Sequence, residues 1–341
     1  VNILNEFCKR YDSYAIIRTA PMPCFDIGWN KNKNTNVVKL FKKQFYPKEL
    51  LNDDGFNYNV FNRYIIKFMG EVNPTSLHAM VNKSEKSTLL IVNMAESSFQ
   101  RVYLLNAHIC PADRLKILNN IFDDLKQGIK LLVISTQVIE AGVDISFPVV
   151  YRDAAPPSCV VQASGRCNRN GEFKTGNVYV FLYRNNNETR YDCDMVYHTI
   201  MDYGFREKIK NKIPAMTEIE FHDYCKTYFA ELAKRPEQGK VNEKQNIIDD
   251  ILNGKFYDLG KYRFIQGDIN THTIYVGDDD IWSEYVSLFN EMKLANNYEE
   301  RDIVNIKFKH IRGIILQKCI TVPQKTFETI KVDENDIFGV Y

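Results

Sequence analysis

The sequence has almost no excess of charge of one sign, because 44 lysines and arginines stand against 43 aspartates and glutamates. A formal net charge of +1 does not point to nucleic acid, so any such contact has to come from local patches. The eight cysteines contain no C-x-x-C pair, and their spacing indicates neither a zinc site nor a disulfide framework. A reducing cytoplasm is the simplest compartment for such a chain.

Long hydrophobic runs are also missing. No apolar stretch reaches the roughly 18 residues that a membrane span needs, so we expect no membrane partner. The first residues, VNILNEFCKRYDSY, lack the apolar core of a secretory signal. The first residue is Val1 rather than Met, as expected of a fragment.

What the sequence does contain is an alternation of short apolar runs with helix-length amphipathic segments. The runs cover residues 88–94, 102–107, 130–135, 149–153 and 177–183. Between the second and third runs, a helical pattern begins at Pro111 and ends at Gly128. This alternation predicts an α/β fold with a mostly parallel sheet and helices on both faces. In such sheets the working residues follow the carboxyl ends of the strands.

Two polar groups follow strand ends in this region. In LLVISTQVIEAGVDISF, residues 131–147, an apolar run passes into polar residues that remain in an apolar setting. They are Ser135, Thr136, Glu140, Gly142 and Asp144. The second group, QASGRCNRNG, covers residues 162–171 and follows the next strand.

A strand-end hydroxyl loop with G-x-D, followed by Q-x-x-G-R-x-x-R, resembles the second RecA-like domain of superfamily 2 helicases. The wording STQVIEAGVDISFPVVYRD and QASGRCNRNG is more closely similar to the CRISPR-associated helicase-nuclease of type I interference. The segments TLLIVNMAESSFQRVYLL, HICPADR and VYVFLY resemble the same family, and the close resemblance covers about residues 88–184. It implies a RecA-like domain of an enzyme that translocates 3′ to 5′ on single-stranded DNA, with ATP and Mg²⁺ as cofactors.

The resemblance implies that Arg166 and Arg169 are catalytic. In such motors ATP sits between two RecA-like domains, and a guanidinium delivered across the cleft stabilises the charge of phosphoryl transfer. Arg169 is the expected arginine finger. The three-residue spacing predicts that both arginines project from the same side of a helix.

Nucleotide and DNA contacts are implied as well. Gln162 would organise the nucleotide interface, Gly142 would let the backbone approach the nucleotide, and Asp144 would hold the ribose or the loop beneath it. Thr136 and Ser135 would offer hydroxyls to the phosphates of the single strand.

Several polar features have structural interpretations beside functional ones. A structural ion pair to an arginine explains Glu140 as well as a functional role does. The dipeptide His222-Asp223 is interpreted as a helix surface, and the acidic pairs at 123–124 and 249–250 as solvated helix edges.

A complete motor needs G-x-x-x-x-G-K-[ST] and an acidic pair that holds magnesium. None of the Gly-Lys pairs of this chain is followed by Ser or Thr. We therefore expect the C-terminal portion of the enzyme, with the first RecA-like domain and the HD nuclease domain supplied in cis or trans. The type I CRISPR surveillance complex is a further expected partner. The alternatives are a truncated, non-catalytic module that binds that complex or DNA and competes with or regulates the motor, and an unrelated superfamily 2 helicase half.

The length of 341 residues suggests about two domains. The expected parts are a remnant of the first RecA-like domain (1–24), the second one (25–190), a helical linker (191–255) and a small α+β C-terminal domain (256–341). Within the last part, residues 271–277 and 304–322 predict strands and residues 279–295 predict a helix.

Three further segments suggest contacts with DNA. YAIIRTAPMP, residues 14–23, resembles the turn that couples hydrolysis to DNA, although Pro21 replaces a hydroxyl residue there. Lysines beside aromatics in 39–48 and 205–213 suggest weak binding to single strands. Solvated surfaces explain the two lysine-rich segments equally well, and a plain proline-rich turn after a short strand explains residues 14–23 equally well.

Overall fold

A computed structural model describes residues 62–92, 99–140, 142–186, 188–197, 203–234, 271–294 and 298–329. Contacts group the chain into two compact units. The first consists of Val1–Val102 with Lys130–Arg263, and the second of Tyr103–Ile129 with Phe264–Tyr341. These units are not the four ranges expected from the sequence, whose boundaries stay a prediction. The expectations for residues 1–60, including Pro21, and for the pair at 249–250 lie outside the described residues.

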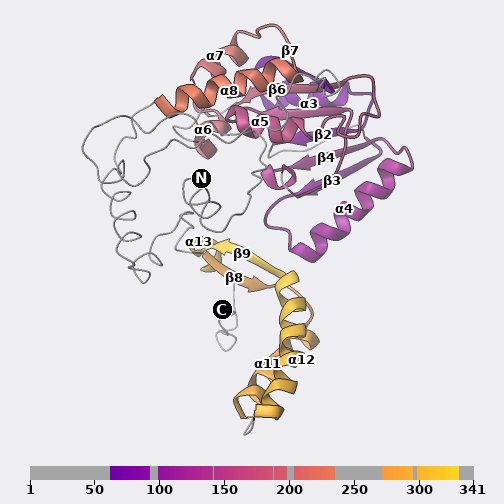
Figure 1. Ribbon diagram of the computed structural model, residues 1–341, viewed down its shortest axis with the longest axis vertical. Helices are drawn as coiled ribbons and strands as arrows, with labels where there is room; N and C mark the ends of the chain where they lie inside the picture. Colours follow the sequence, from indigo (N-terminus) through magenta and orange to yellow (C-terminus); the bar gives the residue numbers. More distant parts are fainter. Residues whose placement is uncertain are drawn as a thin grey trace, which may run out of the picture. The chain divides into compact units, whose positions relative to one another are not determined.

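A seven-stranded sheet is the central element of the fold (Figure 1). Its strands are β1 (Tyr64–Val72), β2 (Thr88–Ile91), β3 (Arg101–Leu105), β4 (Leu131–Ser135), β5 (Val149–Asp153), β6 (Gly176–Tyr183) and β7 (Met216–Thr217). Their order is β3-β4-β2-β5-β6-β1-β7. Strands β4, β2, β5, β6 and β1 run parallel, whereas β7 pairs antiparallel with β1. The predicted α/β fold with a mostly parallel sheet is confirmed.

The central strands are apolar at nearly every position because both faces of the sheet are covered. On one face, Leu77 of α3 (Pro74–Asn82) belongs to the same buried cluster as Leu90 and Phe181. Val180 precedes Phe181 in β6 and therefore points to the other face, where its register partner is Phe68.

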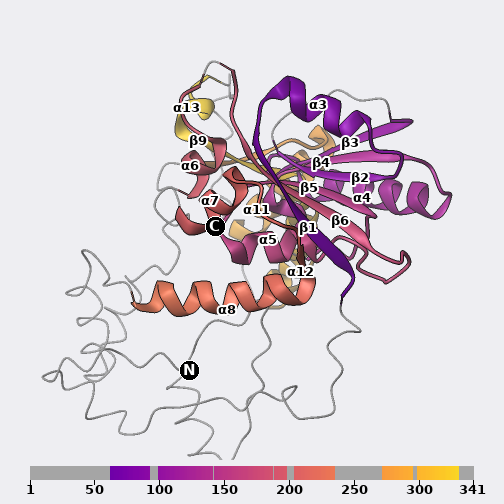
Figure 2. The same ribbon diagram turned by 90° about the horizontal axis from the view of Figure 1, so that it is seen from above.

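The other face carries aromatic contacts. The ring of Phe68 lies 5.9 Å from that of Phe205 in α7 (Tyr203–Lys210). Phe205 in turn lies 5.8 Å from Phe221 of α8 (Glu218–Lys234). Helix α3 and the pair α7 and α8 thus cover opposite faces, as Figure 2 shows. Phe205 is fully buried in this contact, so it is no stacking platform for a base in the segment 205–213.

The second unit contains helices around a small hairpin. Its elements are α4 (Pro111–Lys126), β8 (Thr271–Tyr275), α11 (Asp279–Leu294), α12 (Tyr298–Gln317), β9 (Cys319–Pro323) and α13 (Gln324–Phe327). Strands β8 and β9 pair antiparallel, and α11 and α12 share a core with stacked Tyr285 and Phe308. The helices predicted at 111–128 and 279–295 and the strand predicted at 271–277 are confirmed.

The strand predicted over 304–322 is wrong for most of its length, because α12 continues to Gln317 and only the end lies in β9. The β-branched residues suggested a strand, but the buried positions Phe308, Ile311 and Ile315 recur at helical spacing. The acidic pair at 123–124 is only half solvated. Asp124 is buried and accepts a hydrogen bond from Tyr103 Oη at 2.6 Å.

In the part of the chain that the structure describes, no helix has both the length and the apolar character that a membrane span requires.

Candidate functional site

The first polar group of the sequence begins at the carboxyl end of β4, beside the carboxyl end of β5. Ser135 ends β4 and Arg152 lies one residue before the end of β5. Both are register partners of Ile91 in β2, the strand between them. The parallel sheet therefore places the turn after β4 and the end of β5 at the same level.

The turn after β4 is held through its backbone by Arg166. The turn consists of residues 136–140 and includes the short 3₁₀ helix η2 (Gln137–Ile139). Arg166 donates from Nε to the Ile139 carbonyl at 3.0 Å and from Nη2 to the Glu140 carbonyl at 2.8 Å. Burial, and then the charge of Arg169, lower the pKa of Arg166. An arginine remains charged in such a setting, so the guanidinium acts here as a fixed donor fork.

The side chain of Glu140 is held by Arg152. Its carboxylate lies 2.9 Å from Arg152 Nε, and both side chains are about 95% buried. Burial raises the pKa of Glu140, whereas Arg152 opposes that shift. Glu140 thus occupies the structural ion pair that was one of its two interpretations.

Arg152 has two further contacts. It donates from Nη1 to the Asp153 carbonyl at 3.1 Å and from Nη2 to Tyr197 Oη at 2.7 Å. Tyr197 is the last residue of α6 (Asp192–Tyr197). Sequence reasoning missed both Arg152 and Tyr197. An arginine inside the apolar run VVYRD was the available signal, because a buried charge requires a partner.

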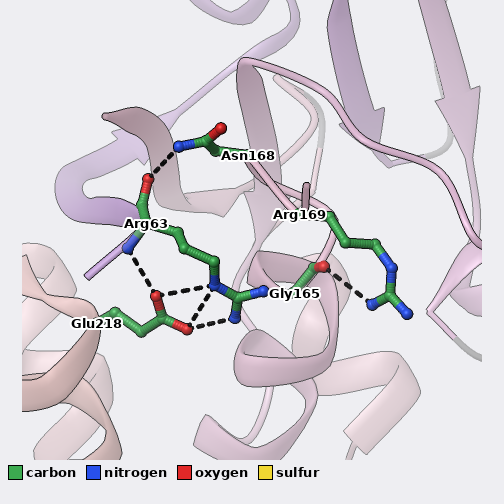
Figure 3. A network of polar contacts seen from close by, with 5 residues as sticks. All are labelled: Arg63, Gly165, Asn168, Arg169 and Glu218. Carbon is green, nitrogen blue, oxygen red and sulfur yellow. Dashed lines mark hydrogen bonds and ion pairs between the residues drawn. The ribbon is translucent and has the colours of Figure 1, made fainter. Parts of the chain in front are cut away.

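Arg169 differs from Arg166 in its exposure. Its side chain is 38% exposed, and its Nε forms an ion pair with the Asp144 carboxylate, which is 81% exposed. A long hydrogen bond of 3.4 Å runs from Nη1 to the Gly165 carbonyl (Figure 3). The arginine expected to be the finger is thus the accessible one of the pair.

The two arginines do not project from a helix, contrary to expectation. Helix α5 (Pro157–Ser164) ends before them, with Gly165 as its C-cap. The chain then passes through Cys167, which forms an isolated bridge with Phe147, and through Asn168, whose φ is +46°. The left-handed residue Asn168 turns the chain between the two arginines, and Arg166 is buried whereas Arg169 is exposed.

Asn168 fixes the turn that carries Arg169. Its side chain donates to the carbonyls of Arg63 and Phe173 at 2.9 Å and 2.7 Å, and its Oδ1 accepts from Phe173 N at 2.9 Å. The backbone of Arg63 donates to Glu218 at 2.9 Å, and its guanidinium binds the same carboxylate (Figure 3). The turn is therefore tied to the start of β1 and to the first turn of α8.

The remaining residues predicted from the sequence are Ser135, Thr136, Gly142 and Gln162. Ser135 is fully buried and donates from Oγ to the Thr136 carbonyl at 2.9 Å, so its hydroxyl does not face solvent. Thr136 is half-buried and precedes η2. Gly142 has φ +76° with open space at the Cβ position, so its glycine is explained by the backbone conformation. Gln162 is exposed on α5.

Among the described residues, no group of three His, Cys, Asp or Glu side chains could hold a metal ion. His222 and Asp223 are exposed on α8, which confirms their interpretation as a helix surface. Cys167 is buried, and Cys159 is partly buried.

Comparisons with solved structures give likenesses at low sequence identity. The crystal structure of T. fusca Cas3 with AMPPNP has a TM-score of 0.48 and 13% identity, covering 80% of this chain and 37% of that one. A structure described as a CRISPR RNA-guided surveillance complex, pre-nicking, has a TM-score of 0.47 and 12% identity, covering 80% and 39%.

Sequence comparison gives closer matches over shorter segments. The CRISPR-associated nuclease/helicase Cas3 of Haloferax volcanii is 51% identical over 73 residues, which are 21% of this chain and 8% of that protein. The matched part thus spans a small fraction of that relative. The family described as CRISPR-associated nuclease/helicase Cas3, C-terminal, matches residues 76–172, which include both polar groups of the site. Residues 76–172 of this chain are therefore similar to the C-terminal region of the CRISPR-associated nuclease/helicase Cas3 family.

Proposed function

We propose that this chain is the C-terminal helicase portion of an ATP-dependent DNA helicase-nuclease of type I CRISPR interference. It supplies the arginine finger, Arg169, and a DNA-contacting turn, residues 136–140. The observation that carries the proposal is the contrast within one site. The guanidinium of Arg166 is buried and donates to two backbone carbonyls. Arg169 is exposed, on a turn that Asn168 fixes.

Arg169 is suited to binding a phosphate. Its partner Asp144 is highly exposed, and such surface ion pairs contribute only about 0–1 kcal/mol. Exchange of this carboxylate for a phosphate therefore costs little, and the guanidinium can bind two phosphate oxygens at once. Gln162 and Gly142 complete this side of the nucleotide interface, and Arg166 supports it by holding the turn.

ATP and Mg²⁺ would be held mainly by the first RecA-like domain, because the 341 residues contain no phosphate loop. The metal would neutralise charge on the transferring phosphoryl group. Among the described residues, no group of three His, Cys, Asp or Glu side chains could hold this metal. This chain would then provide the trans-acting half of the site.

Thr136 is the residue proposed to contact DNA. The buried contacts of Arg166 and Glu140 fix the turn, so the half-buried Thr136 is presented at the carboxyl end of β4. A hydroxyl at that position can bind a phosphate of single-stranded DNA without reading a base. The buried Ser135 contributes indirectly, through its bond to the Thr136 carbonyl. The HD nuclease domain and the surveillance complex are further proposed partners, in the cytoplasm.

The test is complementation. Phosphate release is measured from the chain alone, with single-stranded DNA, and with a separately expressed protein bearing the first RecA-like domain. We expect no turnover by the chain alone and restored turnover with its complement. In the restored mixture, Arg169→Ala should lower turnover by about 10³- to 10⁵-fold.

The matched control is Arg190→Ala, an exposed arginine of the same unit outside the site, which should leave turnover unchanged. Robust turnover by the isolated chain would contradict the division of the nucleotide site. Restored turnover that ignores Arg169→Ala would remove the finger assignment and leave the fold intact.

A second function, competition with the complete motor, is favoured by the missing phosphate loop. The same chain is then titrated into a complete helicase-nuclease with single-stranded DNA. Inhibition of turnover, together with failure to complement a first RecA-like domain, would favour the competing module.

A further inference from the structure

The turn after β4 is closed into a ring by a side chain from another element. Gln137 donates from Nε2 to Tyr197 Oη at 3.2 Å, and Arg152 donates to the same oxygen at 2.7 Å. Arg152 also forms the ion pair with Glu140. Gln137 and Glu140 are also joined within the turn, because the Glu140 N–H donates to the Gln137 carbonyl at 2.9 Å. One hydroxyl on α6 thus connects to Gln137 directly and to Glu140 through Arg152.

The hydroxyl of Tyr197 has no equivalent substitute in this ring. Arg152 is 3% exposed, so water can hardly replace the acceptor of its Nη2. A buried donor that loses its acceptor costs more than the net value of the hydrogen bond. Displacement of Tyr197 would therefore leave Arg152 poorly satisfied and would release Gln137 from α6.

Helix α6 is itself connected to other parts of the first unit. Cys193 is fully buried, and Asp194 forms an ion pair with Arg206 of α7. Tyr191, just before the helix, donates a hydrogen bond to Glu71 in β1. A displacement of α7 or of the end of β1 would therefore move α6, and Tyr197 would transmit that movement to the turn 136–140.

We propose that Tyr197 is a positioning residue that couples helix α6 to the turn 136–140 and thereby sets the geometry in which Thr136 meets DNA. The assignment rests on the proposed function of that turn. When α6 is in place, Tyr197 Oη accepts from Gln137 and Arg152, and the turn is held closed. When α6 moves away, Arg152 keeps only Glu140 and the Asp153 carbonyl as partners, and the turn loosens.

The first experiment needs no ligand. Amide hydrogen exchange of residues 137–140 is measured in the 341-residue chain and in Tyr197→Phe, which removes only the hydroxyl. We expect exchange at these amides to become about 10-fold faster, as for the loss of hydrogen bonds to a charged group. The control is Tyr151→Phe, which removes a hydroxyl bonded to the Met80 carbonyl at 3.2 Å, in the same sheet. It should leave these amides unchanged.

The second experiment separates positioning from a merely structural contribution. In the mixture complemented with the first RecA-like domain, Tyr197→Phe should raise the single-stranded DNA concentration for half-maximal stimulation by about 5- to 10-fold. The Michaelis constant for ATP should not change.

Exchange in Tyr197→Phe that equals the Tyr151→Phe control would overturn the coupling. Faster exchange without a shift in the DNA requirement, or with an equal shift in the Michaelis constant for ATP, would overturn the positioning assignment. If the wild-type mixture shows no turnover, the proposed function fails, and the exchange experiment still decides whether Tyr197 holds the turn.

Discussion

The site has a buried side and an exposed side that use the same kinds of residue differently. On the buried side, Glu140 and Arg152 form an ion pair, and Arg166 donates to two backbone carbonyls of the turn. On the exposed side, Arg169 and Asp144 form a solvent-facing pair. Residue type alone therefore does not mark an arginine as functional. The contrast indicates that the buried side maintains the shape of the turn, whereas the exposed side can exchange its partners.

The largest effect that tests this contrast is expected for Arg152→Met. The substitution leaves Glu140 buried without its partner, and breaking a buried ion pair in this way costs about 3–5 kcal/mol. The free energy of unfolding is measured by urea denaturation at pH 7. The double variant Arg152→Met, Glu140→Leu removes both charges and should recover most of that loss. A loss below about 1 kcal/mol for the single variant would mean that the buried side does not maintain the turn.

The next effect is a pH dependence at Asp153, which lies beside this ion pair. Burial raises the pKa of Asp153 to about 7 from an ordinary 3.8, although its Oδ1 accepts hydrogen bonds from Tyr183 N at 2.9 Å and Ala154 N at 2.8 Å. Between about pH 4 and 7 the folded state retains a proton that the unfolded state has released. Stability therefore falls as pH rises through this window, by roughly 1.4 kcal/mol per pH unit at most, and is level above it.

Asp153→Asn keeps an oxygen acceptor and removes the titration. The measurement is the difference in unfolding free energy between wild type and variant at pH 5, 6, 7 and 8. That difference should move in favour of the variant up to about pH 7 and then stay constant. A difference that does not change with pH would show that Asp153 titrates normally.

A smaller effect is expected at Asn168, which separates the buried arginine from the exposed one. Its φ of +46° is a left-handed conformation that costs a residue other than glycine about 1–2 kcal/mol. Asn168→Gly loses the side-chain hydrogen bonds but adopts the left-handed conformation without strain. Asn168→Ala loses the same hydrogen bonds and is strained in that conformation. Glycine avoids the strain of the left-handed conformation, but it also loses more conformational freedom on folding. We therefore expect Asn168→Ala to be less stable than Asn168→Gly by only about 1 kcal/mol. Equal midpoints of thermal unfolding would show that the conformation contributes nothing.

Sequence patterns predicted the fold better than the site. The runs at 130–135 and 149–153 were recognised because buried parallel strands are continuously apolar. Strand β1 was missed, although Tyr64, Ile66 and Phe68 alternate with less buried residues, because Lys67 and Gly70 interrupt its apolar character.

The polar groups of the site were identified by motif, but their environments were not. Spacing placed Arg166 and Arg169 on one helix face, whereas the helix ends at Ser164. The side-chain contacts of Tyr197 and Asn168 with Arg152 and Arg63 span 45 and 105 residues. Local periodicity carries no information about such distant partners, so these residues could be found only from the structure.

The smallest expected effect on stability belongs to Arg169→Ala, and it sharpens the comparison most. Arg169 is 38% exposed and Asp144 is 81% exposed, so solvent screens their attraction and the side chains remain hydrated without it. The free energy of unfolding should change by no more than about 0.5 kcal/mol, as for other surface substitutions. Asp144→Ala should behave in the same way, and 1 M salt should leave the small differences within error. The measurement is urea denaturation of both variants beside Arg152→Met. A loss of several kcal/mol in Arg169→Ala would place this arginine on the structural side of the site, so that lost turnover in the complemented mixture would no longer identify a finger. A small loss, combined with lost turnover, would mean that Arg169 acts on a bound group and not on the fold.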